Sequence, residues 1–422
     1  MNNNQKNYKS LKILMVTDSF YPDGIGGKHT YVYNLAKAFK KLGHQIYILT
    51  IKIEKDLPER EIIEGIEVFR YRAQVTGRLV FLFRPLSSFY HIGKLYTEHL
   101  KGINFDIIHF HSLLPAFGLL FSKYLKNKKK IFTFHASTYQ EVVVQSRKKK
   151  YAYGLNPLMF WAIRFIEKYT LSRSDNISVL SEFNAGQLQK LYKIPRAKIK
   201  VIPGGVDIDI FQPAENKTTL RQKLGWEKDA VYILTVRRLV ARMGIDNLIK
   251  AIKNVLENRK EVYLIIAGDG FLKPELELLI SQLKLEKNVR LLGRVTNPDL
   301  FMYYQAADFF VLPTQELEGF GLVSLESLSC GLPVLGTPVG GTIEIIRKFD
   351  ENLLFKDASI DAISEGIMNF LERIKEWPQI SVQARNFAQN NYSWSKIAEK
   401  NEDFFREIMS GNSLLQKKFW AE

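Results

Sequence analysis

The chain alternates between short runs of apolar residues and longer segments in which apolar positions recur with helical spacing. Apolar runs of about four to eight residues, bounded by Gly, Pro or polar residues, are typical of buried strands. The strands expected on this basis cover residues 11–16, 44–51, 66–71, 106–111, 131–135, 176–182, 231–236, 264–270, 289–295 and 309–313. A helix is expected over 31–42, where Gly43 ends it, and another begins near Gly321. This alternation predicts an α/β fold.

Length and composition limit the class of protein. A chain of 422 residues exceeds one ordinary core and predicts two domains of about 200 residues each. The chain has a single cysteine, Cys330, so it cannot form an intramolecular disulfide, and this is consistent with a reducing compartment. We interpret Cys330 as a small buried residue. The first ten residues lack the apolar core of a signal peptide, and no uncharged stretch is long and apolar enough to span a membrane. We therefore expect a cytoplasmic protein, either soluble or peripheral on the inner face of the membrane.

Positive charge is concentrated in the first half of the chain. Residues 1–204 contain 33 Lys and Arg against 14 Asp and Glu, a net charge of +19, whereas the remaining residues carry −3. This asymmetry predicts an anionic partner for the first half: a membrane surface, a phosphorylated acceptor or nucleic acid. Nucleic acid is the least favoured of the three and is not expected as a partner, because no recognition motif accompanies the charge.

Two segments of the first half combine basic with aromatic residues. One covers residues 78–90, and the other covers 147–163, where a run of arginine and lysine precedes Trp161. Basic side chains beside Trp, Tyr, Phe and Leu are typical of segments that lie on a membrane surface, since charge attraction adds to apolar insertion. The alternative is a core helix flanked by solvated lysines.

Two carboxylates lie eight residues apart, at Glu318 and Glu326, on either side of a glycine turn. The apolar run before them ends at Pro313, and the turn of residues 319–321 leads into a helix. A helix N-terminus offers unpaired N–H groups and the positive end of the helix dipole, which suits phosphate. At about 1.5 Å per residue, Glu326 lies about 7 Å along this helix and is placed to bind a ribose attached to the phosphate. Glu318 stays at the entrance of the phosphate-binding turn.

This stretch resembles the E-x7-E motif of retaining glycosyltransferases with the GT-B fold, in particular glycosyltransferase family 4. The sequences S-C-G-L-P-V at 329–334 and G-G-T-I-E-I-I at 340–346 are similar to the segment that follows the motif in that family. The resemblance implies two Rossmann-like domains facing a central cleft. Residues 1–204 would bind the acceptor, with the last helix at 395–422 packed on them, and residues 205–394 would bind the nucleotide sugar.

Other candidate residues follow the first strands of each expected domain. Gly26 and Gly27 form a turn before a helix, and their spacing does not match the dinucleotide pattern G-x-G-x-x-G, so a nicotinamide site is disfavoured. His111 and His135 end two strands, where open α/β sheets bind ligands, although core histidines are the common alternative. The resemblance implies that Gly26 and Gly27 face the donor, that His135 lies beside the transferred sugar with His111 behind it, and that Val295 backs the nucleobase.

The segment after residues 231–236 departs from the family's pattern. The family shows G-R-L-x-x-x-K-G, whose Arg and Lys neutralise the donor diphosphate, whereas this chain reads R-R-L-V-A-R-M-G. Arg238 aligns with the family's Arg, but Arg237 replaces the Gly and Met243 replaces the Lys. Arg242 is predicted to supply the missing cation, because Arg pairs well with phosphate and has a long reach. A weakened donor site is the alternative interpretation.

The resemblance and these residues predict a retaining glycosyltransferase, specifically a hexosyltransferase. It would move a sugar from a nucleotide-diphosphate donor to a lipid-linked or cell-envelope glycan acceptor. The predicted catalytic residues are Glu318, Arg238, Arg242 and His135, and the predicted donor-binding residues are Gly26, Gly27, Gly319, Phe320, Gly321, Leu322, Val323, Glu326 and Val295. Arginines and N–H groups would stabilise the departing diphosphate, so no metal and no cofactor are expected.

Other functions remain open for a chain of this kind. A nucleotide-sugar epimerase of the same fold would turn over the donor with no acceptor present. A phosphorylase of this form would require inorganic phosphate. A basic membrane- or nucleic-acid-binding protein with a degenerate donor site is a third class, favoured by charge alone.

Overall fold

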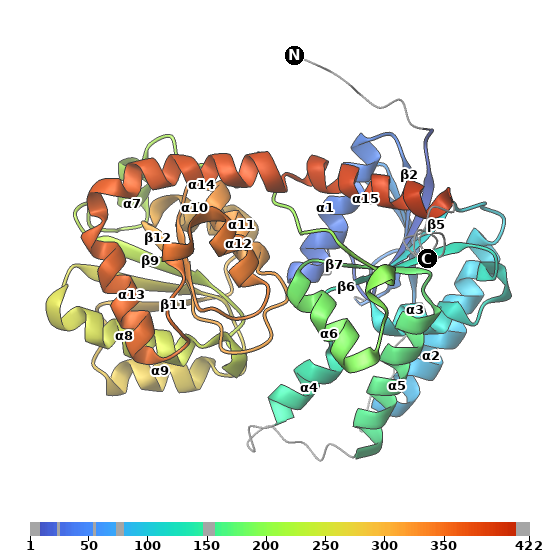
Figure 1. The fold of residues 1–422 in the computed structure, drawn as a ribbon, viewed down its shortest axis with the longest axis horizontal. Coiled ribbons are helices and arrows are strands. Elements are labelled where there is room, and N and C mark those ends of the chain that lie inside the picture. Colours follow the sequence, from blue (N-terminus) through green and yellow to red (C-terminus); the bar gives the residue numbers. More distant parts are fainter. Residues whose placement is uncertain (1–8, 23–25, 54–55, 73–79, 147–156, 411–422) are drawn as a thin grey trace, which may run out of the picture. The chain divides into compact units, whose positions relative to one another are not determined.

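The computed structural model describes residues 9–22, 26–53, 56–72, 80–146, 157–410 of the chain (Figure 1). Two compact units divide it. The first unit comprises residues 1–180, 184–202 and 394–422, and the second comprises 181–183 and 203–393. Each unit is built on its own sheet flanked by helices, which confirms the predicted α/β class.

The sheet of the first unit has the strand order β3-β4-β2-β1-β5-β6-β7-β8. Its pairs are parallel except for β3 with β4. The strands are β1 (Lys12–Val16), β2 (Gln45–Ile51), β3 (Arg60–Ile63), β4 (Ile66–Tyr71), β5 (Ile107–Phe110), β6 (Lys129–Phe134), β7 (Asn176–Val179) and β8 (Ile199–Val201). The apolar runs predicted from the sequence supply six of these strands. The strand order reverses between β1 and β5, and ligands bind at such points in open α/β sheets.

One hairpin of this unit differs from expectation. The sequence predicted a single strand here, at residues 66–71, yet β3 and β4 form an antiparallel pair and β4 is largely buried. Glu64 and Gly65 turn the chain with φ of 50° and 76°. Two successive residues with positive φ are typical of the two-residue turns that match the twist of a hairpin. The alternating charges of this segment hid that turn.

Helices cover the first sheet, and the last helix of the chain packs among them. They are α1 (Gly27–Lys41), α2 (Val80–Leu95) with the π-helical turn η1 (Tyr96–Leu100), α3 (Leu113–Leu120), α4 (Thr138–Ser146), α5 (Pro157–Arg173), α6 (Glu182–Tyr192) and α15 (Trp394–Met409). The helix α15 lies against α1, where the ring centroids of Phe39 and Phe405 are 5.5 Å apart and those of Tyr31 and Trp394 are 5.4 Å apart. Residues 411–422 of the expected last helix lie outside the described residues.

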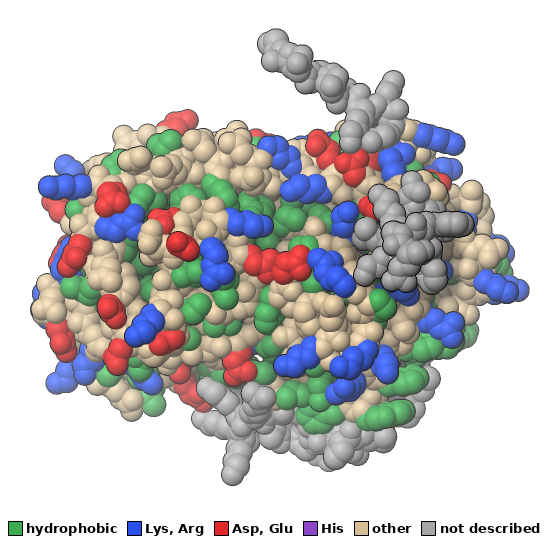
Figure 2. Space-filling view, viewed as in Figure 1, with side chains coloured by type: hydrophobic (Ala, Val, Ile, Leu, Met, Phe, Trp, Pro, Cys, Tyr) green, Lys and Arg blue, Asp and Glu red, His purple; other side chains and the backbone are tan. Residues whose placement is uncertain are grey.

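A row of contacting aromatic rings crosses the surface of the first unit over α2, α3 and α5. We call it the aromatic row; in order along the surface it consists of Phe89, Phe121, Tyr169, Phe165 and Trp161. Neighbouring ring centroids lie 5.3 to 6.1 Å apart. Four of the rings are exposed, Trp161 by 63%. Figure 2 shows hydrophobic side chains at the surface beside Lys and Arg in the part of the view where Figure 1 labels α5.

The second unit has a fully parallel sheet in the order β11-β10-β9-β12-β13. Its strands are β9 (Val231–Val236), β10 (Val262–Ala267), β11 (Val289–Gly293), β12 (Phe309–Leu312) and β13 (Val334–Gly336). Its helices are α7 (Lys217–Lys223), α8 (Ile245–Asn258), α9 (Lys273–Gln282), α10 (Asn297–Ala306), α11 (Leu322–Ser329), α12 (Thr342–Asp350), α13 (Ile360–Glu372) and α14 (Trp377–Tyr392). The order reverses between β9 and β12, so the switch point of this sheet lies between their carboxyl ends.

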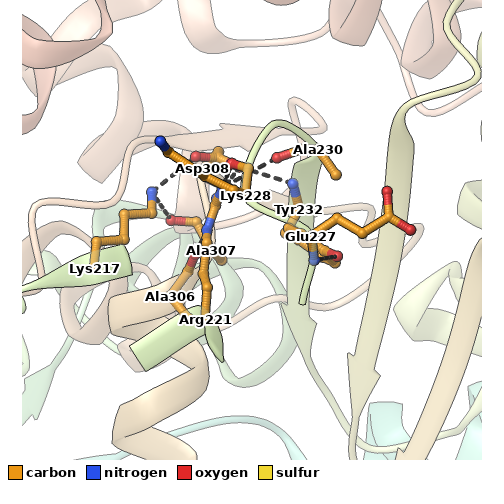
Figure 3. Close-up of polar contacts among 9 residues, drawn as sticks. All are labelled: Lys217, Arg221, Glu227, Lys228, Ala230, Tyr232, Ala306, Ala307 and Asp308. Carbon is orange, nitrogen blue, oxygen red and sulfur yellow. Dashed lines mark hydrogen bonds and ion pairs between the residues drawn. The ribbon is translucent and has the colours of Figure 1, made fainter. Parts of the chain in front are cut away.

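A charged cluster fixes the opposite, amino-terminal ends of β9 and β12 (Figure 3). Arg221 of α7 is buried; it donates to the carbonyl oxygens of Ala306 and Ala230 and to the Asp308 carboxylate. Lys217 also contacts Asp308, at 2.8 Å, and the Asp308 carboxylate accepts the N–H of Tyr232. Because every charge in this cluster has a partner and the carbonyl oxygens are satisfied, we interpret it as structural.

Candidate functional site

The switch point of the second unit brings together residues that follow β9 and β12. Arg237 is the first residue after β9, and its N–H continues the sheet by donating to Ala267. Thr314 and Glu318 follow β12. Residues of two neighbouring strands that are distant in sequence therefore meet at the carboxyl edge of the sheet, where α/β folds bind their ligands.

Arg237 lies at the centre of this group. Its Nη2 forms an ion pair with the Glu318 carboxylate, donates to Thr314 Oγ1 at 2.9 Å and lies 2.6 Å from Met243 Sδ. The side chains of Arg237 and Glu318 are 6% and 11% exposed. Burial opposes ionisation of Glu318, but the charges of Arg237 and Arg242 outweigh it and hold its pKa below the ordinary value. Glu318 is therefore a carboxylate at neutral pH.

Two glycines allow the loops of this site to pack closely. A Cβ atom on Gly268 would lie 1.8 Å from the carbonyl oxygen of Arg237, and one on Gly340 would lie 2.1 Å from that of Glu318. Gly268 has φ of 149° and Gly340 has φ of 63°. Only glycine fits these contacts and angles without displacement of the backbone, so the two glycines fix the positions from which Arg237 and Glu318 project.

Arg242, the residue predicted to supply the missing cation, is buried and bonds to the loop that carries Glu318. Its Nη1 donates to the carbonyl oxygen of Leu317 at 2.9 Å, and its own carbonyl oxygen accepts the N–H of Gln315 at 2.8 Å. Arg242 thus shapes the loop that carries Glu318. Arg238 is exposed at the same edge of the sheet.

The sequence interpretation missed Arg237, which it treated only as a replacement for glycine. The usable signal was the pair of departures from the family pattern: one position gains a cation and a position six residues later loses one. The direct contact between Arg237 and Met243 shows that these two positions are neighbours.

The helix starts of α11 and α12 converge beside this group. Gly321, with φ of 85°, precedes the first residue of α11, and Thr342 begins α12. A Cβ atom on Gly321 would lie 3.3 Å from Thr342 Oγ1 and 3.4 Å from Ser324 Oγ. Both hydroxyls are buried and have no hydrogen-bond partner within the described part of the chain. Two helix N-termini and two unpaired hydroxyls at one place suit an anion with several acceptor oxygens.

Glu326 lies just over one turn into α11 from this convergence and has a partner that the sequence did not reveal. The hydroxyl of Tyr304, on α10, donates to its carboxylate at 2.9 Å. Burial raises the pKa of Glu326 to about 7, although the Tyr304 hydrogen bond acts in the opposite direction. Tyr304 gave no sequence signal, because its pairing depends on how α10 and α11 pack.

The remaining predicted donor residues surround these groups. Phe320 is buried in the turn, and Leu322 and Val323 are half-buried in the first turn of α11. Gly319 precedes Phe320 in the same turn, where its carbonyl oxygen lies close to Gly341. Val295 follows β11, which belongs to the same parallel sheet.

In the first unit, the predicted glycines lie at the start of α1. Gly26, with φ of 112°, is the residue before the helix, and its carbonyl oxygen accepts the N–H groups of His29 and Thr30. Gly27 is the first helical residue. Lys28 forms a 2.7 Å ion pair with Asp18, which follows β1. This glycine loop lies at the switch point of the first sheet.

The predicted histidines of the first unit lie in an aromatic cluster. The ring of His135 lies 5.0 Å from that of Tyr31 and 5.7 Å from that of His111, which in turn is 4.0 Å from that of His109. Burial lowers the pKa of His135 to about 3 and holds that of His111 far below its ordinary value, so both rings are neutral near pH 7. Both nitrogens of His111 and Nε2 of His135 are buried with no hydrogen-bond partner among the described residues.

Comparison with protein families assigns both units. The sequence model of Glycosyltransferase Family 4 matches residues 25–210, and that of Glycosyl transferases group 1 matches residues 216–391. The two matches are separated by five residues, and each covers most of one unit. The chain belongs to glycosyltransferase family 4.

Relatives extend over almost the whole glycosyltransferase. An uncharacterized glycosyltransferase of Methanocaldococcus jannaschii is 28% identical over 411 residues, which are 94% of this chain and 99% of the relative. The GPI3 subunit of the Saccharomyces cerevisiae phosphatidylinositol N-acetylglucosaminyltransferase is 23% identical, with 96% of this chain and 84% of the relative covered. Sucrose-phosphate synthase from Thermosynechococcus elongatus has a similar structure, with a TM-score of 0.80 at 21% identity, covering 95% of this chain and all of the other. The glycosyltransferase therefore has the predicted GT-B fold.

The described residues of the glycosyltransferase contain no helix that is long and apolar enough to cross a membrane. Within the same residues, no group of three or more His, Cys, Asp or Glu side chains is arranged to hold a metal ion. Cys330 is free and buried at the end of α11, as the sequence suggested.

Proposed function

We propose that this glycosyltransferase transfers a hexose from a nucleoside-diphosphate sugar to a lipid-linked or cell-envelope glycan acceptor, with retention of the anomeric configuration and without a metal ion. The observation that carries the proposal is the convergence of the α11 and α12 N-termini on two buried, unpaired hydroxyls. Ser324 and Thr342 supply those hydroxyls, and arginine side chains lie at the same edge of the sheet. Such a site fits a diphosphate.

The rest of the donor fits around that diphosphate. Glu326 lies further along α11, where its carboxylate can accept hydrogen bonds from the ribose hydroxyls, as acidic residues do in other nucleotide folds. Val295, after β11, would lie against the nucleobase. Glu318 would face the transferred sugar, and its ionised carboxylate would favour the positive charge that develops on the sugar ring.

The proposed reaction breaks the bond between the anomeric carbon and the β-phosphate oxygen and forms a bond from the acceptor oxygen to the same face of that carbon. The acceptor hydroxyl gives its proton to the departing phosphate oxygen, so no side-chain base is required. Arginine charges and the N–H groups at the start of α11 stabilise the leaving diphosphate, which is the role that a metal ion has in other transferases. This arrangement supports the proposal that no metal is needed.

A thermal-shift panel tests the donor half of the proposal. Wild-type protein and Glu326→Ala are heated with UDP-, GDP- and ADP-sugars in the presence of EDTA. We expect one nucleotide class to raise the melting temperature of the wild type, because a ligand that binds only the folded state stabilises it. The shift should be smaller for Glu326→Ala. No shift with any nucleotide sugar would contradict the proposed donor site.

The acceptor half of the proposal rests on the aromatic row and its basic surroundings. Arg164, Lys168 and Arg173 are exposed on α5, and the Arg173 guanidinium lies 5.3 Å from the ring centroid of Tyr169. The one acidic residue of α5, Glu167, is buried and accepts a hydrogen bond from Tyr192. Exposed rings with only cations beside them on this helix suit the interface of an anionic membrane, where a lipid-linked acceptor resides.

The two segments that first suggested membrane contact are only partly described. Residues 80–90 form the first part of α2, and residues 157–163 begin α5. The basic run at 147–150 and residues 78–79 lie outside the described residues. The proposal therefore rests on the aromatic row and on the charge of the first half of the chain.

Co-sedimentation with vesicles tests the membrane surface. The variant Trp161→Ser/Phe165→Ser removes two rings that are 63% and 48% exposed, and Phe271→Ser/Leu278→Ser removes two apolar side chains of similar exposure from the second unit. The vesicles consist of phosphatidylcholine with about 30 mol% phosphatidylglycerol, which gives them an anionic surface. Binding to them should fall about 10-fold or more for the first variant only. Equal binding by both variants, or no binding of the wild type at low salt, would contradict this surface.

A further inference from the structure

We propose that the guanidinium group of Arg237 binds the diphosphate of the donor and thereby replaces the lysine expected at the position of Met243. The inference rests on the donor site proposed above and assigns a binding role to a residue that the family pattern places outside that site. It makes the change of Lys to Met at one position and the gain of Arg at the other a single exchange rather than a loss of function.

The contact between the two side chains supports the exchange. Nη2 of Arg237 lies 2.6 Å from Met243 Sδ, and both side chains are buried at the switch point of the second sheet. In a lysine at position 243, the ammonium nitrogen would lie two bonds beyond the atom that corresponds to this sulfur. Nη2 of Arg237 thus lies at about the distance from this sulfur at which that ammonium would lie.

The remaining contacts of Arg237 leave it incomplete without a ligand. Its Nη2 contacts Glu318, Thr314 and Met243. Its Nε is buried and has no hydrogen-bond partner among the described residues. A buried guanidinium has five N–H donors, and leaving one unpaired is costly. An anion with several oxygens satisfies such a group, and the two unpaired hydroxyls beside Gly321 are further donors at the same sheet edge.

Arg242, the other buried arginine near Glu318, is tied to the loop instead. Its Nη1 donates to the carbonyl oxygen of Leu317, although its Nε, like that of Arg237, is buried with no hydrogen-bond partner among the described residues. Met243 has no charge to offer. The backbone of Arg237 is fixed by its sheet bond to Ala267 and by the close approach of Gly268, so its side chain projects from a rigid position. Preorganised cations of this kind stabilise charge without a reorganisation cost at the moment of reaction.

Isothermal titration calorimetry with UDP, GDP and ADP, at pH 8 in EDTA, tests the exchange. The variants are Arg237→Gly, the double variant Arg237→Gly/Met243→Lys, and Arg290→Ala, which removes an exposed arginine on β11 of the same sheet. The nucleoside monophosphate with the same base is the second probe, because it lacks the β-phosphate. Circular dichroism and the melting temperature show that each variant is folded.

Arg237→Gly should weaken the nucleoside diphosphate about 10- to 100-fold and the monophosphate much less. The double variant should recover most of that loss, and Arg290→Ala should bind as the wild type does. A folded Arg237→Gly with wild-type affinity, or an equal loss for both probes that Met243→Lys leaves in place, would overturn the inference. A wild type that binds none of the three diphosphates would instead overturn the donor site, and the role of Arg237 with it.

Discussion

Binding of the nucleotide sugar should depend on the protonation of Glu326. The pKa of this carboxyl is about 7 in the ligand-free protein, because burial disfavours the charged form. Ribose hydroxyls that donate to the carboxylate favour the charged form, so the bound state has a lower pKa and binding releases a proton. Affinity should therefore increase as the pH rises through 7.

The size of the effect follows from the same pKa. At pH 6 a group with a pKa of about 7 is mostly protonated, and at pH 8 it is mostly ionised. If the bound pKa lies below 6, the affinity at pH 8 exceeds that at pH 6 about 10-fold, which corresponds to about 1.4 kcal/mol. His135 does not contribute in this range, since burial keeps its pKa near 3, and Glu318 stays ionised.

Calorimetric titration of the stabilising nucleotide sugar from pH 6 to 8 measures this dependence. The intact nucleotide sugar is the probe, because a terminal phosphate titrates near pH 6 and would add its own pH dependence. Glu326→Gln should bind weakly at every pH. Tyr304→Phe removes the hydrogen bond that lowers the pKa of Glu326, so the midpoint should move above 7. A wild-type affinity that is flat between pH 6 and 8, or that falls, would refute a ribose-binding carboxylate at this position.

Three further predictions concern stability and packing. Glu326→Gln should raise the melting temperature of the ligand-free protein at pH 8 but not at pH 4, and unchanged melting at both pH values would contradict this prediction. The raised pKa of Glu326 contributes stability that is present below pH 4.5 and lost as the pH rises to about 7, so the gain at pH 8 has an upper limit of about 3 kcal/mol. Arg221→Met should lower the free energy of unfolding, measured by urea titration, by about 3 kcal/mol, because it breaks a buried ion pair with Asp308 at the opposite end of the sheet from the switch point. Nucleotide affinity should stay constant, and weaker nucleotide binding would contradict a purely structural role for Arg221. Gly340→Ala should reduce nucleotide affinity and destabilise the fold by about 1 to 3 kcal/mol, because the new Cβ would lie 2.1 Å from the Glu318 carbonyl oxygen. A variant with wild-type nucleotide affinity by calorimetry and wild-type thermal unfolding would refute this close packing.

The sequence predicted the elements whose signal is local. Buried strands such as β9 and β12 were visible as apolar runs, and the helix after Gly321 was visible from its glycine turn. The two glutamates and Arg238 were also singled out as candidates, because motif spacing is a local property. The hairpin of β3 and β4 was missed, since charged residues interrupt its apolar pattern and only the φ angles of its turn reveal it.

The parts of the site that depend on tertiary contact were not predictable from one sequence. Tyr304 reaches Glu326 from a different helix, and no spacing relates the two residues. The position of Arg237 against Met243 arises from the fold of the loop after β9, and its ion pair with Glu318 joins residues that are 81 positions apart. Arg242 was predicted from its reach alone, and no sequence pattern showed its hydrogen bond to the Leu317 carbonyl oxygen.

Transfer of a labelled sugar tests the central claim most directly. Wild-type protein, Glu318→Gln and Arg290→Ala are incubated in EDTA with the radiolabelled nucleotide sugar that stabilises the wild type and with total membrane lipids, and the lipid phase is extracted. The account predicts label in the lipid phase for the wild type and for Arg290→Ala, release of that label by an α-glycosidase when the donor is an α-glycoside, and little label for Glu318→Gln. Donor turnover without an acceptor, or label released only by a β-glycosidase, would contradict a retaining transferase.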